Sequence, residues 1–197
     1  MTNIRANKVS FDIKPELSRV FVGGFYTWLR HFHKDKDKLV EAFQHIFDLQ
    51  YFYVALDGGE VAAMVACTQG YAPIALQRRE FTGVLGFLRG NIAYHMLKRH
   101  MVRNAYPFKL GRSTGSIEFV ATAPEHRNKG IAHDLILYVM GQNPYDSYVL
   151  EVADTNAGAV HLYQKLGFRE IKRVKAPNPK RSGVNNFLYM RRDMNGD

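Results

Sequence analysis

Residues 117–132 of the chain read IEFVATAPEHRNKGIA, and this stretch decides the fold. Its first half is rich in strand-forming residues, and its second half is a polar turn that leads into an apolar helix. A turn of this kind brings free backbone N–H groups to the positive end of a helix, so it predicts an anion-binding site. Gly130 lets a phosphate approach the backbone without meeting a Cβ atom, and Arg127 and Lys129 add positive charge beside it.

A second informative stretch, residues 150–168, reads LEVADTNAGAVHLYQKLGF. The pattern predicts a strand, then a helix over residues 156–166 that ends at Gly167 in a left-handed C-cap. Tyr163 lies on the apolar stripe of this helix, which favours a place in the core on spacing alone. Asn156 is typical of an N-cap, because its side chain can accept a hydrogen bond from the first turn.

The remaining chain predicts a mixed α/β sheet in one domain of residues 1–197, with no internal repeat. Asp57, Gly58, Gly59 and Glu60 indicate a hairpin that pairs two strands antiparallel. Residues 70–113 are interpreted as a helical insertion, since an unstructured loop of that length is unusual. Strands are expected at residues 9–13, 51–56, 61–68, 116–122, 148–152, 168–174 and 186–191, and helices at 15–30, 35–47, 81–103, 131–140 and 156–166.

Composition narrows the classes of function. Apolar residues make up 46% of the chain and charged residues 23%, which is typical of a globular protein. The net charge of +9 favours anionic partners, but the basic residues are too dispersed to indicate a nucleic-acid surface. No apolar run approaches the length of a signal peptide or a membrane span, and Cys67 is the only cysteine. A cytoplasmic location, with no membrane contact, is therefore expected.

Both stretches resemble the GNAT acetyltransferases, whose cofactor motif is Arg or Gln, two residues, Gly, one residue, then Gly or Ala. Arg127, Gly130 and Ala132 match it, although Thr122 stands where valine is more usual. The resemblance implies a GNAT fold, with a central mixed sheet splayed between its fourth and fifth strands and flanked by helices. It places the helical insertion between the third and fourth strands and the cofactor-binding core at about residues 115–175.

The resemblance also implies that acetyl-CoA is the co-substrate and assigns residues to it. The strand residues would hold the pantetheine and the turn would hold the pyrophosphate, while Asn156 would add a bond to the cofactor. The pantetheine residues are Val120, Ala121 and Thr122, and the pyrophosphate residues are Arg127, Asn128, Lys129, Gly130, Ile131 and Ala132.

Acyl transfer to an amine requires a neutral amine, so a base or a water chain must remove its proton. Glu118 is the candidate base, although a strand carboxylate is equally compatible with a solvated or salt-bridged role. Tyr163 matches the family's helix tyrosine, which would protonate the departing thiolate. Cys67 lies in an apolar strand that favours packing over a covalent route. No histidine spacing suggests a metal site, and none is predicted.

The sequence does not name the acceptor, and it leaves rival functions open. The prediction is direct transfer to a primary amine in a ternary complex, by a monomer or a homodimer. A catalytically silent acyl-CoA-binding or regulatory domain would keep the cofactor turn without needing Glu118 or Tyr163. The insertion is either part of the acceptor pocket or only a cap or dimer surface. The aromatics expected at such a pocket are Tyr71, Phe81, Phe87 and Tyr94.

Overall fold

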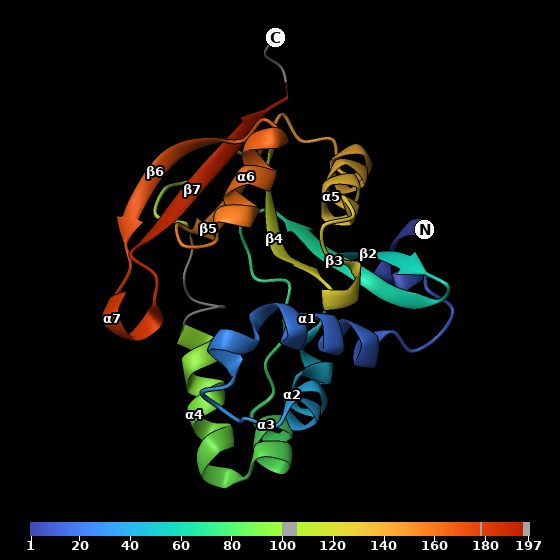
Figure 1. Ribbon diagram of the computed structural model, residues 1–197, viewed down its shortest axis with the longest axis vertical. Helices are drawn as coiled ribbons and strands as arrows, with labels where there is room; N and C mark the ends of the chain where they lie inside the picture. Colours follow the sequence, from blue (N-terminus) through green and yellow to red (C-terminus); the bar gives the residue numbers. More distant parts are fainter. Residues whose placement is uncertain (100–105, 178, 195–197) are drawn as a thin grey trace.

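The computed structural model describes residues 1–99, 106–177 and 179–194. In this part of the chain, seven strands form one mixed sheet in the order β1-β2-β3-β4-β5-β7-β6 (Figure 1). The strands are β1 (Thr2–Arg5), β2 (Phe52–Asp57), β3 (Glu60–Thr68), β4 (Thr114–Thr122), β5 (Ser147–Ala153), β6 (Arg169–Lys175) and β7 (Asn186–Asp193). The predicted α/β class and the antiparallel hairpin of β2 and β3 are confirmed.

Helices cover both faces of the sheet, so the core is divided into two layers (Figure 1). One layer lies under α5 (Ile131–Gln142) and α6 (Ala157–Lys165), and the other under the N-terminal helices and the insertion. Strand β3 is apolar along nearly its whole length because both of its faces are covered. The second layer is formed by α1 (Lys14–Leu29), α2 (Lys36–Phe43), α3 (Arg78–Leu85) and α4 (Phe87–Leu97). A short helix, α7 (Pro179–Ser182), lies between β6 and β7 in the sequence.

The first strand differs from the prediction. The strand expected at residues 9–13 is absent, and β1 at Thr2–Arg5 pairs with β2 instead. The apolar alternation at residues 9–13 is misleading because its middle member, Phe11, is 43% exposed and does not define a buried strand face. Strand β1 carries little hydrophobic signal because it lies at the edge of the sheet. The guanidinium of Arg5, its last residue, lies over the ring of Tyr53 in β2.

The predicted insertion between the third and fourth strands is confirmed, but its helix is divided. The chain forms α3 and then α4, with the break at Gly86. The prediction for residues 100–103 lies outside the described residues. The two helices pack against α2 and the N-terminal core, so the insertion extends the layer that faces away from α5 and α6 (Figure 1).

The predicted splay between the fourth and fifth strands is present. Strands β4 and β5 are parallel and pair only from Thr114 with Ser147 to Ser116 with Val149. Beyond these pairs β4 continues to Thr122 without β5 beside it, while β5 remains paired with β7. The sheet is therefore open along one edge of β4.

Candidate functional site

A β-bulge interrupts β4 at the open edge. Met64 pairs with Ala121 and Ala66 pairs with Glu118, so β4 has an extra residue between these two pairs. Phe119, within the bulge, has a φ of 52°. An extra residue of this kind leaves backbone groups without ladder partners and bends the strand.

The bulge places two consecutive side chains on one face of the sheet, where a regular strand would alternate them. Glu118 pairs with Ala66, which belongs to the core layer under α1, and Phe119 packs in the same layer with its ring 5.9 Å from Phe52. Val120 packs instead against the layer under α5 and α6. Glu118 and Val120 therefore lie on opposite faces of the sheet at the opening.

Glu118 has the electrostatic character of a base that works near neutral pH. Burial raises its pKa from 4.5 to about 7, the Ser116 hydroxyl lowers it by hydrogen bonding, and the charge of Glu151 raises it further. Glu118 has no ion pair among the described residues, so the salt-bridged alternative is not what the structure contains. A carboxyl group with this pKa is partly ionised at pH 7 and can exchange a proton there.

The Ser116 hydroxyl connects Glu118 to a short polar chain on the same face. Its oxygen lies 2.7 Å from Thr68 Oγ1 and accepts the Gly70 N–H at 3.0 Å. The Thr68 hydroxyl donates to the Tyr71 carbonyl at 2.9 Å. Because Ser116 has one hydroxyl proton, it donates either to Glu118 or to Thr68 Oγ1, so this chain couples the carboxylate to the polar groups behind it.

Tyr163 approaches from the other face, on α6. Its side chain is buried and its ring centroid lies 6.0 Å from that of Phe168, so the predicted packing role is present. Burial raises the pKa of its hydroxyl above the ordinary range. Among the described residues, the Tyr163 hydroxyl has no hydrogen-bond partner.

The turn before α5 has the geometry of an anion site. Gly130 has a φ of 77° and leads into α5, and no protein atom lies within 4 Å of the place where its Cβ would stand. In the described chain, the N–H groups of residues 131–133 have no hydrogen-bond acceptor. Asn128 also adopts a left-handed φ, of 60°. These exposed donors at a helix N-terminus form a site that suits a phosphate.

The other predicted cofactor residues surround the same opening. Arg127 is exposed, and it also braces the turn by donating to the carbonyls of Thr122 and Gly23, each at 3.4 Å. Ala121 and Ile131 are buried, whereas Lys129 is exposed. The structure thus brings the strand residues 120–122 and the turn residues 127–132 to one end of the splay.

Asn156 is confirmed as the N-cap of α6, because its side-chain oxygen accepts the Ala159 N–H at 3.3 Å. The aromatics expected from the insertion do not form one wall. Phe81 is fully buried against Phe43, with ring centroids 5.3 Å apart, so it cannot contact an acceptor. Phe87 is 76% exposed on the outer side.

Several polar groups of the site were not singled out from the sequence. Glu151 and Tyr189 are direct register partners in β5 and β7, and Tyr106 lies near both Glu118 and Glu151. Glu151 is part of the second motif stretch, but its place two residues beyond the last β4–β5 pair is evident only from the structure. Tyr106 reaches the site through tertiary folding, for which no local pattern exists.

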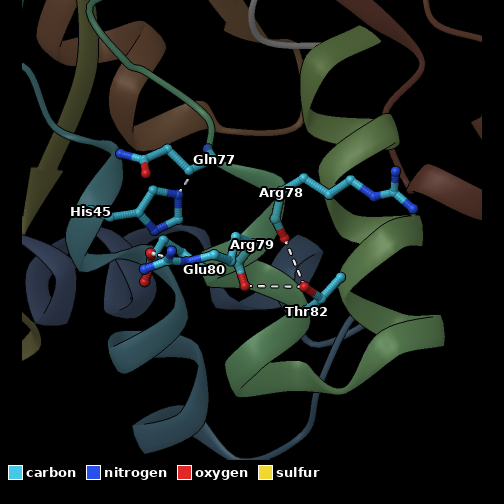
Figure 2. A network of polar contacts seen from close by, with 6 residues as sticks. All are labelled: His45, Gln77, Arg78, Arg79, Glu80 and Thr82. Atoms are coloured by element: carbon cyan, nitrogen blue, oxygen red, sulfur yellow. Dashed lines mark hydrogen bonds and ion pairs between the residues drawn. The ribbon is translucent and has the colours of Figure 1, made fainter.

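A separate polar network secures the insertion (Figure 2). His45 Nε2 accepts the Gln77 N–H at 3.2 Å, and the Thr82 hydroxyl donates to the Arg78 and Arg79 carbonyls. A cavity of about 280 Å³ lies beside it, but no predicted site residue lines that cavity. The contact between His45 and Gln77 holds the start of α3 to the segment after α2, which is a structural role.

Among the described residues, no group of three or more histidine, cysteine, aspartate or glutamate side chains could hold a metal ion. The helices in the described ranges include none with the length and apolar content needed to cross a membrane.

The profile of the Acetyltransferase (GNAT) family matches residues 21–168, and the chain belongs to this family. No curated protein matches the chain in sequence. Solved structures nevertheless share the fold over nearly the whole chain.

An N-acetyltransferase from Staphylococcus aureus Mu50 has a TM-score of 0.62 at 16% identity, covering 98% of this chain and 100% of that chain. The ribosomal-protein-S18-alanine N-acetyltransferase from Escherichia coli has a TM-score of 0.56 at 12% identity, covering 100% and 95%. A protein from Pyrococcus horikoshii OT3 has a TM-score of 0.59 at 16% identity, covering 99% of each chain. At such identities the similarity concerns the fold.

Proposed function

We propose that the chain transfers the acetyl group of acetyl-CoA to a primary amine by direct attack in a ternary complex. The observation that carries the proposal is the bulge in β4, which turns Glu118 toward one face of the open edge and Val120 toward the other. One face can thus receive the cofactor while the other receives the amine. Acetyl-CoA supplies an acetyl thioester to this opening when it is bound.

The residues present fit that co-substrate. The free N–H groups of residues 131–133 and the charge of Arg127 suit the pyrophosphate. The unpaired edge of β4, including residues 120–122, offers backbone donors and acceptors to the amide groups of pantetheine. Asn156 already uses its side-chain oxygen as an N-cap, which leaves its amide nitrogen for the cofactor.

The proton transfers balance with two residues. As the new N–C bond forms and the C–S bond breaks, Glu118 accepts the proton that the amine must lose. Tyr163 donates its hydroxyl proton to the departing thiolate and regains one from solvent. The raised pKa of Tyr163 keeps its hydroxyl protonated until the thiolate appears, but it also makes the hydroxyl a weaker acid, so the proton moves only as the C–S bond breaks and negative charge develops on the sulfur.

The test is a thiol-release assay with acetyl-CoA and a panel of amines, with mass spectrometry of each amine. The proposal expects CoA release that depends on the amine, and an amine that gains one acetyl group. Calorimetry should detect acetyl-CoA binding to the protein alone. Acetyl-CoA binding without transfer to any amine would instead establish a catalytically silent acyl-CoA-binding domain.

A further inference from the structure

The face of the sheet that carries Glu118 also carries a second carboxylate in a comparable position. Ser116 pairs with Val149, so Glu118 and Glu151 each lie two residues beyond the last β4–β5 pair, on the same face. Paired strands lie about 5 Å apart, and β4 and β5 diverge here, so the two positions are on the order of 5–10 Å apart. Glu118 is half-buried, whereas Glu151 is exposed.

The chain has 27 Lys and Arg against 18 Asp and Glu, so cations are available to pair with these carboxylates. No ion pair to Glu118 or Glu151 exists among the described residues. The cation in the same register row as Glu151 and Tyr189 is Lys172, and it donates to the Pro107 carbonyl at 3.0 Å. The negative charge is therefore left for a ligand.

Aromatic rings lie beside these carboxylates. Tyr106, Phe108 and Tyr189 form a cluster with ring centroids 5.7, 5.9 and 5.8 Å apart. Burial raises the pKa of Glu151, and hydrogen bonding from the Tyr189 hydroxyl lowers it by a smaller amount. Charges on both Glu118 and Glu151 act on the Tyr106 hydroxyl, so this member of the cluster lies near both carboxylates. Aromatic faces next to carboxylates are favourable surroundings for an ammonium group and for its carbon chain.

We propose that the acceptor is a small amine with a second cationic group, held by Glu151 and the rings of Tyr106, Phe108 and Tyr189 while its reacting nitrogen meets Glu118. This inference rests on the proposed function and adds the substrate class. A four-carbon diamine spans about 6 Å between its nitrogens, which lies within the range of roughly 5–10 Å between the two strand positions. A single carboxylate would suffice for a monoamine, whereas a second cationic group on the acceptor gives Glu151 an ion-pair partner.

The experiment compares acceptors of equal length and different charge. Rates are measured with 1,4-diaminobutane, 1-aminobutane and 4-aminobutanoate at saturating acetyl-CoA, together with diamines of about three and five carbons. The best diamine should exceed 1-aminobutane at least about tenfold in kcat/KM, and 4-aminobutanoate should be the poorest. Glu151→Gln should reduce the ratio of diamine to monoamine about tenfold, whereas Glu60→Gln, an exposed control with the same charge change, should preserve it.

The outcomes separate this inference from the proposed function. Equal kcat/KM for the diamines and 1-aminobutane, or a ratio unaffected by Glu151→Gln, would overturn the inference while acetyl transfer stands. Better turnover of a peptide N-terminus with uncharged side chains would overturn it too. If no amine is acetylated, calorimetry with 1,4-diaminobutane tests the site alone: binding that Glu151→Gln weakens supports a diamine-binding site although the proposed function fails, and absence of binding overturns the inference.

Discussion

Replacing Glu118 with glutamine should abolish most of the activity and yet make the folded protein more stable at alkaline pH. The substitution keeps the size of the side chain and removes its charge. The pKa of Glu118 rises from 4.5 to about 7 on folding. When the carboxyl is ionised in both states, this shift destabilises the folded protein by roughly 3 kcal/mol. Because Glu118 is only half-buried, about 1–3 kcal/mol is the expected gain in the variant.

The sign of the effect depends on pH. Below a pH of 4.5 the carboxyl is protonated in the folded and unfolded states, so its shifted pKa has no effect on stability. Between 4.5 and about 7 the unfolded chain releases the proton first, so the stability of the parent falls as pH rises. Glutamine does not titrate, and the difference between variant and parent should therefore grow over this window and remain constant above it.

Thermal unfolding at about pH 5 and about pH 8.5, followed by circular dichroism, measures this difference. At the higher pH, Glu118→Gln should unfold roughly 2–10 °C above the parent, and near pH 5 the difference should shrink to about a quarter of that value. Its kcat/KM should fall about 10²- to 10⁴-fold. The exposed control Glu60→Gln should show neither change. A variant that is no more stable than the parent at pH 8.5, or that retains full activity, would refute the assignment of Glu118.

Other substitutions test the remaining parts of the site. Tyr163→Phe should lower kcat at least about tenfold with little change in acetyl-CoA affinity, as measured by single-turnover kinetics and calorimetry. An unchanged rate of the chemical step would show that Tyr163 only packs in the core. Gly130→Asp should weaken acetyl-CoA binding by about tenfold or more, because it adds strain and a negative charge at the turn, and normal affinity in a folded variant would exclude the turn as the pyrophosphate site. Ser116→Ala removes a hydroxyl that lowers the pKa of Glu118, so the ascending limb of the kcat/KM profile should move to higher pH; movement to lower pH would be incompatible with that contact.

The parts of the fold set by local chemistry were predictable from the sequence. The turn at residues 127–132, the C-cap at Gly167 and the N-cap at Asn156 each depend on neighbours a few residues away. Gly24 shows the limit of such reasoning. Helix propensity counts it against α1, but a Cβ there would lie 2.8 Å from the Ala121 Cβ. The glycine allows α1 to approach β4, which only the tertiary structure reveals.

The features that complete the candidate site depend on distant partners. The bulge at Phe119 is a register shift relative to β3, and no pattern within β4 specifies it. Strand β1 was missed because an edge strand buries little apolar surface. Tyr106 lies within the insertion, far from Glu151 in the sequence, and comes near it only in the folded protein. Sequence therefore identified Glu118 as a candidate base, whereas the unneutralised second carboxylate and its aromatic neighbours required the fold.

The most direct test of the central claim is hydrogen–deuterium exchange of the backbone with and without acetyl-CoA. The account places the cofactor along the open edge of β4 and at the first turn of α5. Amide protons of residues 117–122 and 128–133 should therefore be protected when acetyl-CoA binds, while those of α3 and α4 should exchange as before. Protection confined to the insertion around His45, or none in β4 and at the start of α5, would contradict the account.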